Sequence, residues 1–350
     1  MKVAIITCHR TYNYGAVLQA YALQTFLNNR GHYAEIIDYY PQYVRTQDRN
    51  LINFPKLILK IPDKVKCNAS FGKFLKDRLN LTDKTYKTCS DLSNDHLNYD
   101  LYITGSDQVW NMNMNNGLDD SYFLSFAPSN SIKISYAASI AMDEINDEQK
   151  KRFIKMLAPF SSISVRENTG VQLLKNIGIK SYAVCDPVYL INKNEWEFIE
   201  KNPATNDKYV LVYAFYQQKE IYEKAWEIAK KYGYKVYSVG ASYFNSFMKV
   251  DKYFWGVSPE LFIGLIHNAQ MVLTNSFHGL SFSIILNIPV IAYKTNTKGN
   301  SRIIDMLKQI GVYVENNSNY IAEITDYSEV NEKVTDYRVK SMEYISRCNL

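Results

Sequence analysis

Late in the chain, an amide, a hydroxyl and an imidazole side chain occur together at residues 275–278, Asn-Ser-Phe-His. Histidine titrates near neutral pH and can therefore take up or release a proton during a reaction. This makes His278 a candidate catalytic residue, and Asn275 and Ser276 candidate substrate-binding residues. The same residue types also suit a helix cap or a hydrogen-bonded loop, and the sequence leaves that alternative open.

The flanking residues predict that this polar turn joins a strand to a helix. An apolar run at 271–273 precedes it, and an apolar segment at 280–286 follows it. Pro289 ends that segment, and residues 290–293 have the β-branched and aromatic composition of a strand. In such a unit the helix N-terminus faces a crevice at the carboxyl edge of the sheet, where it suits a phosphate or carboxylate.

Other predicted strands also end in polar residues that would face this crevice. They are the strand 2–7, followed by Asn13 and Tyr14; the strand 100–104, followed by Ser106; and the strand 162–165, followed by Arg166.

Three cations are candidates for holding an anion in the crevice. Arg166 offers a bidentate contact to a carboxylate or phosphate, and Lys298 and Arg302 lie in and after a polar loop at 295–301. An ion pair between Arg166 and Glu167 or another nearby acid explains Arg166 equally well.

Composition excludes several classes of protein. A net charge of +5 over 350 residues does not indicate a nucleic-acid-binding protein, and no apolar run approaches the length of a membrane span. The five cysteines show no metal-ligand spacing, so we expect free thiols in the cytoplasm and no metal site. No dinucleotide fingerprint of the GxGxxG type follows the first strand.

The order of predicted elements indicates an α/β protein with two Rossmann-like domains that face each other across a cleft. We expect an N-terminal domain at 1–200 and a C-terminal domain at 201–350, the latter ending in a helix at 329–348. A lysine-containing segment at 41–98 reads as an inserted region of helices and loops. Its basic face is compatible with peripheral contact at a membrane, although a solvated surface is the simpler interpretation.

Several motifs resemble those of the polysaccharide pyruvyl transferase family. They run in order over nearly the whole chain: Asn-Tyr-Gly-Ala at 13–16 with Gln19, Thr-Gly-Ser-Asp-Gln-Val-Trp at 104–110, Ser-Val-Arg-Glu at 164–167, Asp-Pro at 186–187, Thr-Asn-Ser-Phe-His-Gly at 274–279 with Pro289, and Arg302. The Ser-Phe-His-Gly turn is the strongest of them. The segment 41–98 matches no motif of the family, so the acceptor stays open.

The resemblance implies a fold like that of the GT-B glycosyltransferases. It also implies transfer of a pyruvyl group from phosphoenolpyruvate to a sugar, with formation of a ketal on a bacterial surface polysaccharide or its lipid-linked precursor. The family's histidine and arginine carry over to His278 and Arg166. Phosphoenolpyruvate is then a donor substrate, and no separate cofactor is implied.

Two other functions remain compatible with the sequence. A glycosyltransferase that uses a nucleotide sugar would bind a nucleoside diphosphate in its second half. A non-catalytic sugar-binding protein would bind its sugar whether or not His278 is present.

Overall fold

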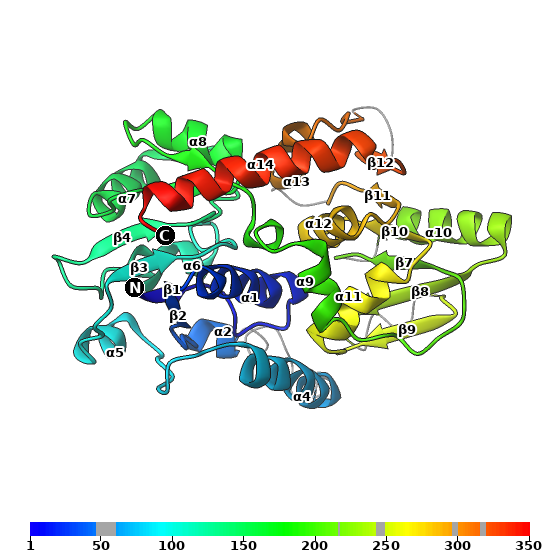
Figure 1. Cartoon of the computed structure of the whole chain (residues 1–350), viewed down its shortest axis with the longest axis horizontal. Helices are drawn as coiled ribbons and strands as arrows, with labels where there is room; N and C mark the ends of the chain where they lie inside the picture. Colours follow the sequence, from blue (N-terminus) through cyan, green and yellow to red (C-terminus); the bar gives the residue numbers. More distant parts are fainter. Residues whose placement is uncertain (47–60, 216–217, 243–248, 296–299, 316–319) are drawn as a thin grey trace.

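The computed structural model describes residues 1–46, 61–215, 218–242, 249–295, 300–315 and 320–350 (Figure 1). Its strands form two main sheets, one on either side of residue 200, and the intervening helices cover them. The chain therefore has an α/β fold with two Rossmann-like domains.

The first sheet is parallel and has the strand order β2-β1-β3-β4. A short parallel pair, β5 and β6, continues beside β4 through a bridge between Ile134 and Ser162. The strands are β1 (Lys2–Ile6), β2 (Tyr33–Ile36), β3 (Leu101–Thr104), β4 (Ile132–Ser135), β5 (Ser164–Val165) and β6 (Tyr182–Ala183). The helices in this half are α1 (Tyr14–Asn29), α2 (Gln42–Thr46), α4 (Ile61–Arg78), α5 (Cys89–Asn94), α6 (Asn115–Leu118), α7 (Asp147–Leu157), α8 (Asn168–Lys175) and α9 (Lys193–Ile199), with the 3-10 turns η1 (Asp120–Phe123) and η2 (Pro187–Tyr189).

The second sheet has the order β12-β11-β10-β7-β8-β9, and only β12 runs antiparallel to its neighbour. Its strands are β7 (Tyr209–Tyr213), β8 (Lys235–Gly240), β9 (Lys252–Trp255), β10 (Met271–Thr274), β11 (Val290–Ala292) and β12 (Ala322–Ile324). The helices of this half are α10 (Lys219–Tyr232), α11 (Pro259–His267), α12 (Phe277–Leu286), α13 (Ser301–Gln309) and α14 (Ser328–Arg347). The predicted strand-turn-helix-strand unit is thus β10-α12-β11, and its two strands are parallel neighbours.

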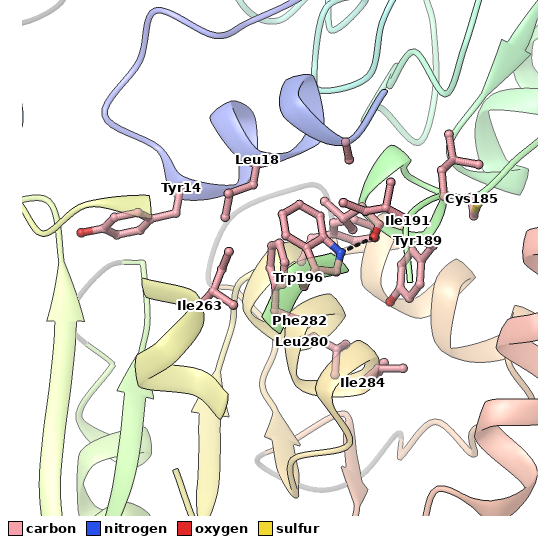
Figure 2. Close-up of a cluster of buried hydrophobic side chains, with 14 of the residues drawn as sticks. Tyr14, Leu18, Cys185, Tyr189, Ile191, Trp196, Ile263, Leu280, Phe282 and Ile284 are labelled. Carbon is pink, nitrogen blue, oxygen red and sulfur yellow. Dashed lines mark hydrogen bonds between the residues drawn. The ribbon is translucent and has the colours of Figure 1, made fainter. Parts of the chain in front are cut away.

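A shared apolar core packs the two halves against each other (Figure 2). The ring of Tyr14, at the start of α1, stacks on Phe262 of α11 with centroids 4.4 Å apart. Trp196 of α9 meets Phe282 of α12 edge to face at 4.9 Å, and its indole N–H donates to the Val188 carbonyl at 3.0 Å. This packing fixes the N-terminus of α1 relative to α12, two of the helices that carry candidate site residues or are capped by them.

The last helix, α14, returns to the first domain and runs beside both halves (Figure 1). The Ser341 hydroxyl accepts the backbone N–H of Cys185 at 2.8 Å, and the Tyr344 hydroxyl donates to the Ser135 carbonyl at 3.0 Å. Helix α4, from the predicted insertion, also links the halves, since the Ser70 hydroxyl donates to the Gly256 carbonyl at 2.8 Å.

Some elements differ from the sequence prediction. The sequence does not predict strands β9 and β12. The segment 192–207 is polar and contains Pro203, which predicts a connection between the domains, but it includes helix α9. Strand β9 shows no apolar alternation, since Lys252 is exposed and its other three side chains are partly buried. Strand β12 alternates buried and exposed side chains, but its three residues are too few to give a recognisable pattern.

Candidate active site

The candidate residues meet where strands of both sheets end. Ser106 follows β3, Arg166 follows β5, and the turn 275–278 follows β10. A cavity of about 370 Å³ lies there, between the domains. It is lined by Asn13, Asp107, Gln108, Asn111, Met114, Phe215, Asn275, Ser276, Phe277, His278, Thr295, Arg302 and Ile303. We call it the interdomain cavity.

Asp186 is the carboxylate around which the buried charges of this site gather. Its Oδ2 accepts from the Ser106 hydroxyl at 3.0 Å and from Nη1 of Arg166 at 2.8 Å. Nε2 of His278 lies 3.5 Å from the same oxygen. Burial alone would raise the pKa of the Asp186 carboxyl, but the proximity of His278 and the charge and hydrogen bond of Arg166 outweigh burial and hold its pKa well below the ordinary value.

Arg166 is buried and only partly neutralised by hydrogen bonds. Its guanidinium lies 4.4 Å from the ring centroid of Phe277, and its Nε is 4.0 Å from Glu167. Burial alone would lower its pKa, but the Asp186 and Glu167 carboxylates raise it, so the group is charged. Nevertheless Nε and Nη2 have no hydrogen-bond partner among the described residues. Buried donors without partners are uncommon and indicate a missing ligand or water.

Arg302 brings a second positive charge to the interdomain cavity. Burial, followed by the positive charge of Arg166, lowers the pKa of Arg302 to about 10. Two guanidinium groups that repel each other are stabilised when an anion binds between them. The Glu167, Asp107 and Asp186 carboxylates oppose this lowering of the pKa of Arg302, and the arrangement suits an anionic ligand.

His278 lies in the first turn of α12 and packs against the start of α1. A Cβ placed on Gly15 would lie 2.0 Å from Nδ1 of His278, so only glycine leaves room for the ring in this position. Nε2 of His278, like Nε of Arg166, is buried without a hydrogen-bond partner in the described part of the chain. The imidazole can thus exchange a proton with a ligand in the cavity without first breaking a hydrogen bond.

The other predicted site residues have structural contacts as well. The Ser276 hydroxyl caps α12 by accepting the Gly279 N–H at 3.3 Å. The Asn275 side chain holds the backbone of Phe215 through two hydrogen bonds of 2.7 and 2.6 Å. Asn13 caps α1 by accepting the N–H of Gly15 at 3.0 Å. All three line the interdomain cavity while they shape its backbone.

Three predicted residues are not among those that line this cavity. Ser106 and Arg166 are buried and bond to Asp186. Tyr14 is 1% exposed in the interdomain core, and its hydroxyl donates to the Gly240 carbonyl at 3.4 Å. Lys298 lies outside the described residues.

Asp186 and Asp107 were not selected as site residues from the sequence. Asp186 had a signal, since the Asp-Pro pair at 186–187 is one of the family motifs. Asp107 lies in another motif, 104–110, but its backbone conformation, with φ of 76°, is visible only in the structure.

Neither a metal-binding group of side chains nor a membrane-spanning helix is found among the described residues. Within the described ranges, no group of three or more His, Cys, Asp or Glu side chains is placed to hold a metal ion. No helix in those ranges combines the length and apolar character needed to cross a membrane.

The fold is that of the GT-B enzymes. The UDP-GlcNAc 2-epimerase of Methanocaldococcus jannaschii superposes with a TM-score of 0.53 at 13% identity, covering 96% of this chain and 99% of that one. The putative UDP-N-acetylglucosamine 2-epimerase of Listeria monocytogenes gives 0.52 at 9% identity, with 98% and 89% covered. No curated protein sequence matches the chain significantly.

The match to a protein family is more specific than the similarity in fold. Residues 13–297 match the family described as polysaccharide pyruvyl transferase, so the chain belongs to that family and is a transferase. The matched range includes Arg166, Asp186 and His278.

Proposed function

We propose that the protein transfers a pyruvyl group from phosphoenolpyruvate to two hydroxyls of a sugar, forming a pyruvate ketal on a surface polysaccharide or its lipid-linked precursor. The observation that carries the proposal is a pair of guanidinium groups: Arg302 lines the interdomain cavity, and Arg166, with unsatisfied donors, lies against the ring of the lining residue Phe277. Phosphoenolpyruvate has a carboxylate and a phosphate, which these cations and the N-terminus of α12 would bind.

The residues support a simple order of events. His278 donates a proton to the methylene carbon of phosphoenolpyruvate, which creates an electrophilic centre at C2. A first sugar hydroxyl forms a bond to C2 and loses its proton. Phosphate then leaves with the electrons of its C2–O bond, and a second hydroxyl closes the ketal ring. Of the two hydroxyl protons, one replaces the proton that His278 gave to carbon and the other leaves with phosphate.

Asp186 would position Arg166 and the protonated His278 during this reaction. It pairs with Arg166 and lies beside His278, so an imidazolium formed at His278 is electrostatically stabilised. The scheme uses only side chains of the protein, and we therefore expect EDTA to leave the rate unchanged. A rate lost to EDTA and restored by a divalent metal would contradict this metal-free scheme.

The decisive experiment measures phosphate release from phosphoenolpyruvate by the purified protein. A panel of nitrophenyl hexosides and lipid-linked sugars serves as acceptors, and nucleotide sugars serve as competing donors. Acceptor-dependent phosphate release supports the proposal. Turnover or tight binding of a nucleotide sugar, with no reaction of phosphoenolpyruvate, would instead assign the protein to the glycosyltransferases.

Two variants test the roles within that assay. His278→Ala is expected to lower turnover by about 10²–10⁴-fold, the usual contribution of general acid–base catalysis, while phosphoenolpyruvate still binds. Arg166→Ala is expected to weaken phosphoenolpyruvate binding. Wild-type turnover in the first variant would remove His278 from the mechanism, and an unchanged dissociation constant in the second would reduce Arg166 to its ion pair with Asp186.

A further inference from the structure

A second cavity, of about 430 Å³, adjoins the interdomain cavity within the first domain. The two share Asn13, Asp107, Gln108 and Met114 in their linings. We call the second one the N-terminal cavity. Because the walls are shared, ligands in the two cavities would lie side by side.

Of the charged or titratable side chains that line the N-terminal cavity, Arg10 and His9 are matched by Asp38, and Asp107 is a further carboxylate. Arg10 makes a two-pronged contact to Asp38, with Nε to Oδ1 at 2.6 Å and Nη2 to Oδ2 at 2.5 Å. Nε2 of His9 lies 3.2 Å from Oδ1 of the same carboxylate. The interdomain cavity, in contrast, is lined by Arg302, whose positive charge is disfavoured by the nearby Arg166. Among the described residues, the lining of the N-terminal cavity therefore favours a neutral ligand over an anion.

The lining also contains tyrosines held in place by hydrogen bonds and asparagines that are exposed to solvent. The hydroxyls of Tyr39 and Tyr43 both donate to Oδ2 of Asp119, at 2.7 and 2.8 Å, which holds the two side chains in place. Asn113 and Asn115 line the cavity and are exposed to solvent. Aromatic rings with amide groups beside them match a pyranose, which has apolar C–H faces and hydroxyls at its edge.

Asp107 lies where the two cavities meet and has an unusual backbone. Its φ of 76° is in the left-handed region, which costs energy for a residue other than glycine. The conformation is held by hydrogen bonds from the N–H groups of Ser139 and Val109 to the Asp107 carbonyl, at 2.9 and 2.8 Å. Its carboxylate is near enough to Arg166 and Arg302 to raise the pKa of each guanidinium, although burial has the larger effect on both.

We propose that the N-terminal cavity is the acceptor site, which binds one neutral pyranose and directs a hydroxyl of that sugar at Asp107. This inference rests on the proposed function, since it assigns the donor to the interdomain cavity. Asp107 acts as the general base: the hydroxyl O–H bond breaks, its oxygen bonds to C2 of the donor, and the proton passes to the carboxylate. A base at the shared wall serves a reaction between ligands in the two cavities.

The site itself is tested by binding, without any reaction. Nitrophenyl hexosides and N-acetylhexosaminides are titrated into the full-length protein and its variants by calorimetry. Tyr43→Ala and Asn115→Ala are each expected to raise the glycoside dissociation constant at least tenfold and to change that of phosphoenolpyruvate less than twofold. Asn115 is exposed, so its replacement does not endanger folding. Tyr313→Ala, at a tyrosine that is 76% exposed elsewhere, is the matched control and should behave as wild type.

Three binding results would overturn the proposal. They are that no glycoside of the panel binds the wild-type protein, that both variants bind glycoside as the wild type does, or that they lose phosphoenolpyruvate affinity to the same extent.

The role of Asp107 is tested by Asp107→Asn. Asparagine has nearly the same shape and also tolerates a positive φ, so the fold is preserved. With a glycoside that binds, kcat for phosphate release should fall about 10²–10⁴-fold while the glycoside dissociation constant stays within threefold. An unchanged kcat would overturn the role of Asp107 as the base. If the wild-type protein binds glycosides but releases no phosphate from phosphoenolpyruvate, the proposed donor fails, and the binding experiment still decides the acceptor site.

Discussion

Gly15 of the first domain and His278 of the second are packed so closely that a methyl group on Gly15 would lie 2.0 Å from Nδ1 of the imidazole. The contact joins the N-termini of α1 and α12, the helices on either side of the interdomain cavity. The position of the candidate catalytic histidine is thus set by a residue far away in the sequence.

Replacement of Gly15 by alanine is therefore expected to displace His278. A shift of about 1 Å in a catalytic group can cost about 100-fold in rate, so kcat for phosphate release should fall by about that factor. Gly72→Ala is the matched control: Gly72 is also in a helix, and a Cβ there meets no atom within 4 Å. The control should keep full activity and be about 0.4–1 kcal/mol more stable. Equal activity of the two variants would show that the Gly15–His278 contact does not position the imidazole for catalysis.

The sequence alone predicts most of the fold and the residues at the edges of the sheets. The turn at 275–278 is recognisable because an apolar strand and an apolar helix flank it, and the structure confirms both as β10 and α12. The two-domain α/β class follows from the alternation of such units. Strand β9 could not be predicted in this way because none of its residues is fully buried and they do not alternate.

Contacts between residues far apart in the chain could not be predicted from the sequence. The site depends on hydrogen bonds to Asp186 from Ser106 and Arg166, which are 80 and 20 residues away along the chain. The return of α14 to the first domain is held by contacts between distant residues, such as the hydrogen bond from Cys185 to Ser341 and the ring contact between Tyr182 and Tyr344. No local periodicity encodes such pairs. Tyr14 shows the same difficulty, since its place after strand β1 suggests a crevice while aromatic packing buries it.

Arg302 should matter for ligand binding and not for stability. In the protein without ligand its charge is disfavoured, as its lowered pKa of about 10 shows, because of burial and the nearby Arg166. Arg302→Gln is therefore expected to weaken phosphoenolpyruvate binding at least tenfold while the free energy of unfolding is unchanged or higher. Lys308→Gln removes an exposed cation from the same helix and is the control. A marked loss of stability with unchanged binding would show that Arg302 has a structural role instead.

Asp186 should make stability depend on pH. Its pKa in the folded protein lies below the value of about 3.9 expected for an unfolded chain. The carboxylate therefore contributes stability above about pH 4, and this contribution is lost as the pH falls toward the folded-state pKa. In Asp186→Asn, the plot of unfolding free energy against pH below pH 4 should be shallower by up to about 1.4 kcal/mol per pH unit.

The same substitution also leaves Arg166 without its closest anion. Removing one partner of a buried ion pair typically costs about 3–5 kcal/mol, so Asp186→Asn should be less stable than the wild type at pH 7. Urea unfolding at several pH values measures both effects. Parallel pH profiles for variant and wild type would mean that the Asp186 carboxyl is not the group that titrates.

Variants of Tyr14 distinguish a role in packing from a role in substrate binding. Its ring stacks on Phe262 at 4.4 Å and on Phe71 at 5.1 Å, and its hydroxyl makes one long hydrogen bond of 3.4 Å to Gly240. Tyr14→Phe keeps the stacking, so it should cost less than about 1 kcal/mol and leave the KM values for donor and acceptor unchanged. Tyr14→Ala opens a hole between the domains and should cost about 3–5 kcal/mol in urea unfolding. A Tyr14→Phe variant with normal stability but a tenfold higher KM would instead show that the hydroxyl contacts a substrate, as its position after the first strand suggests.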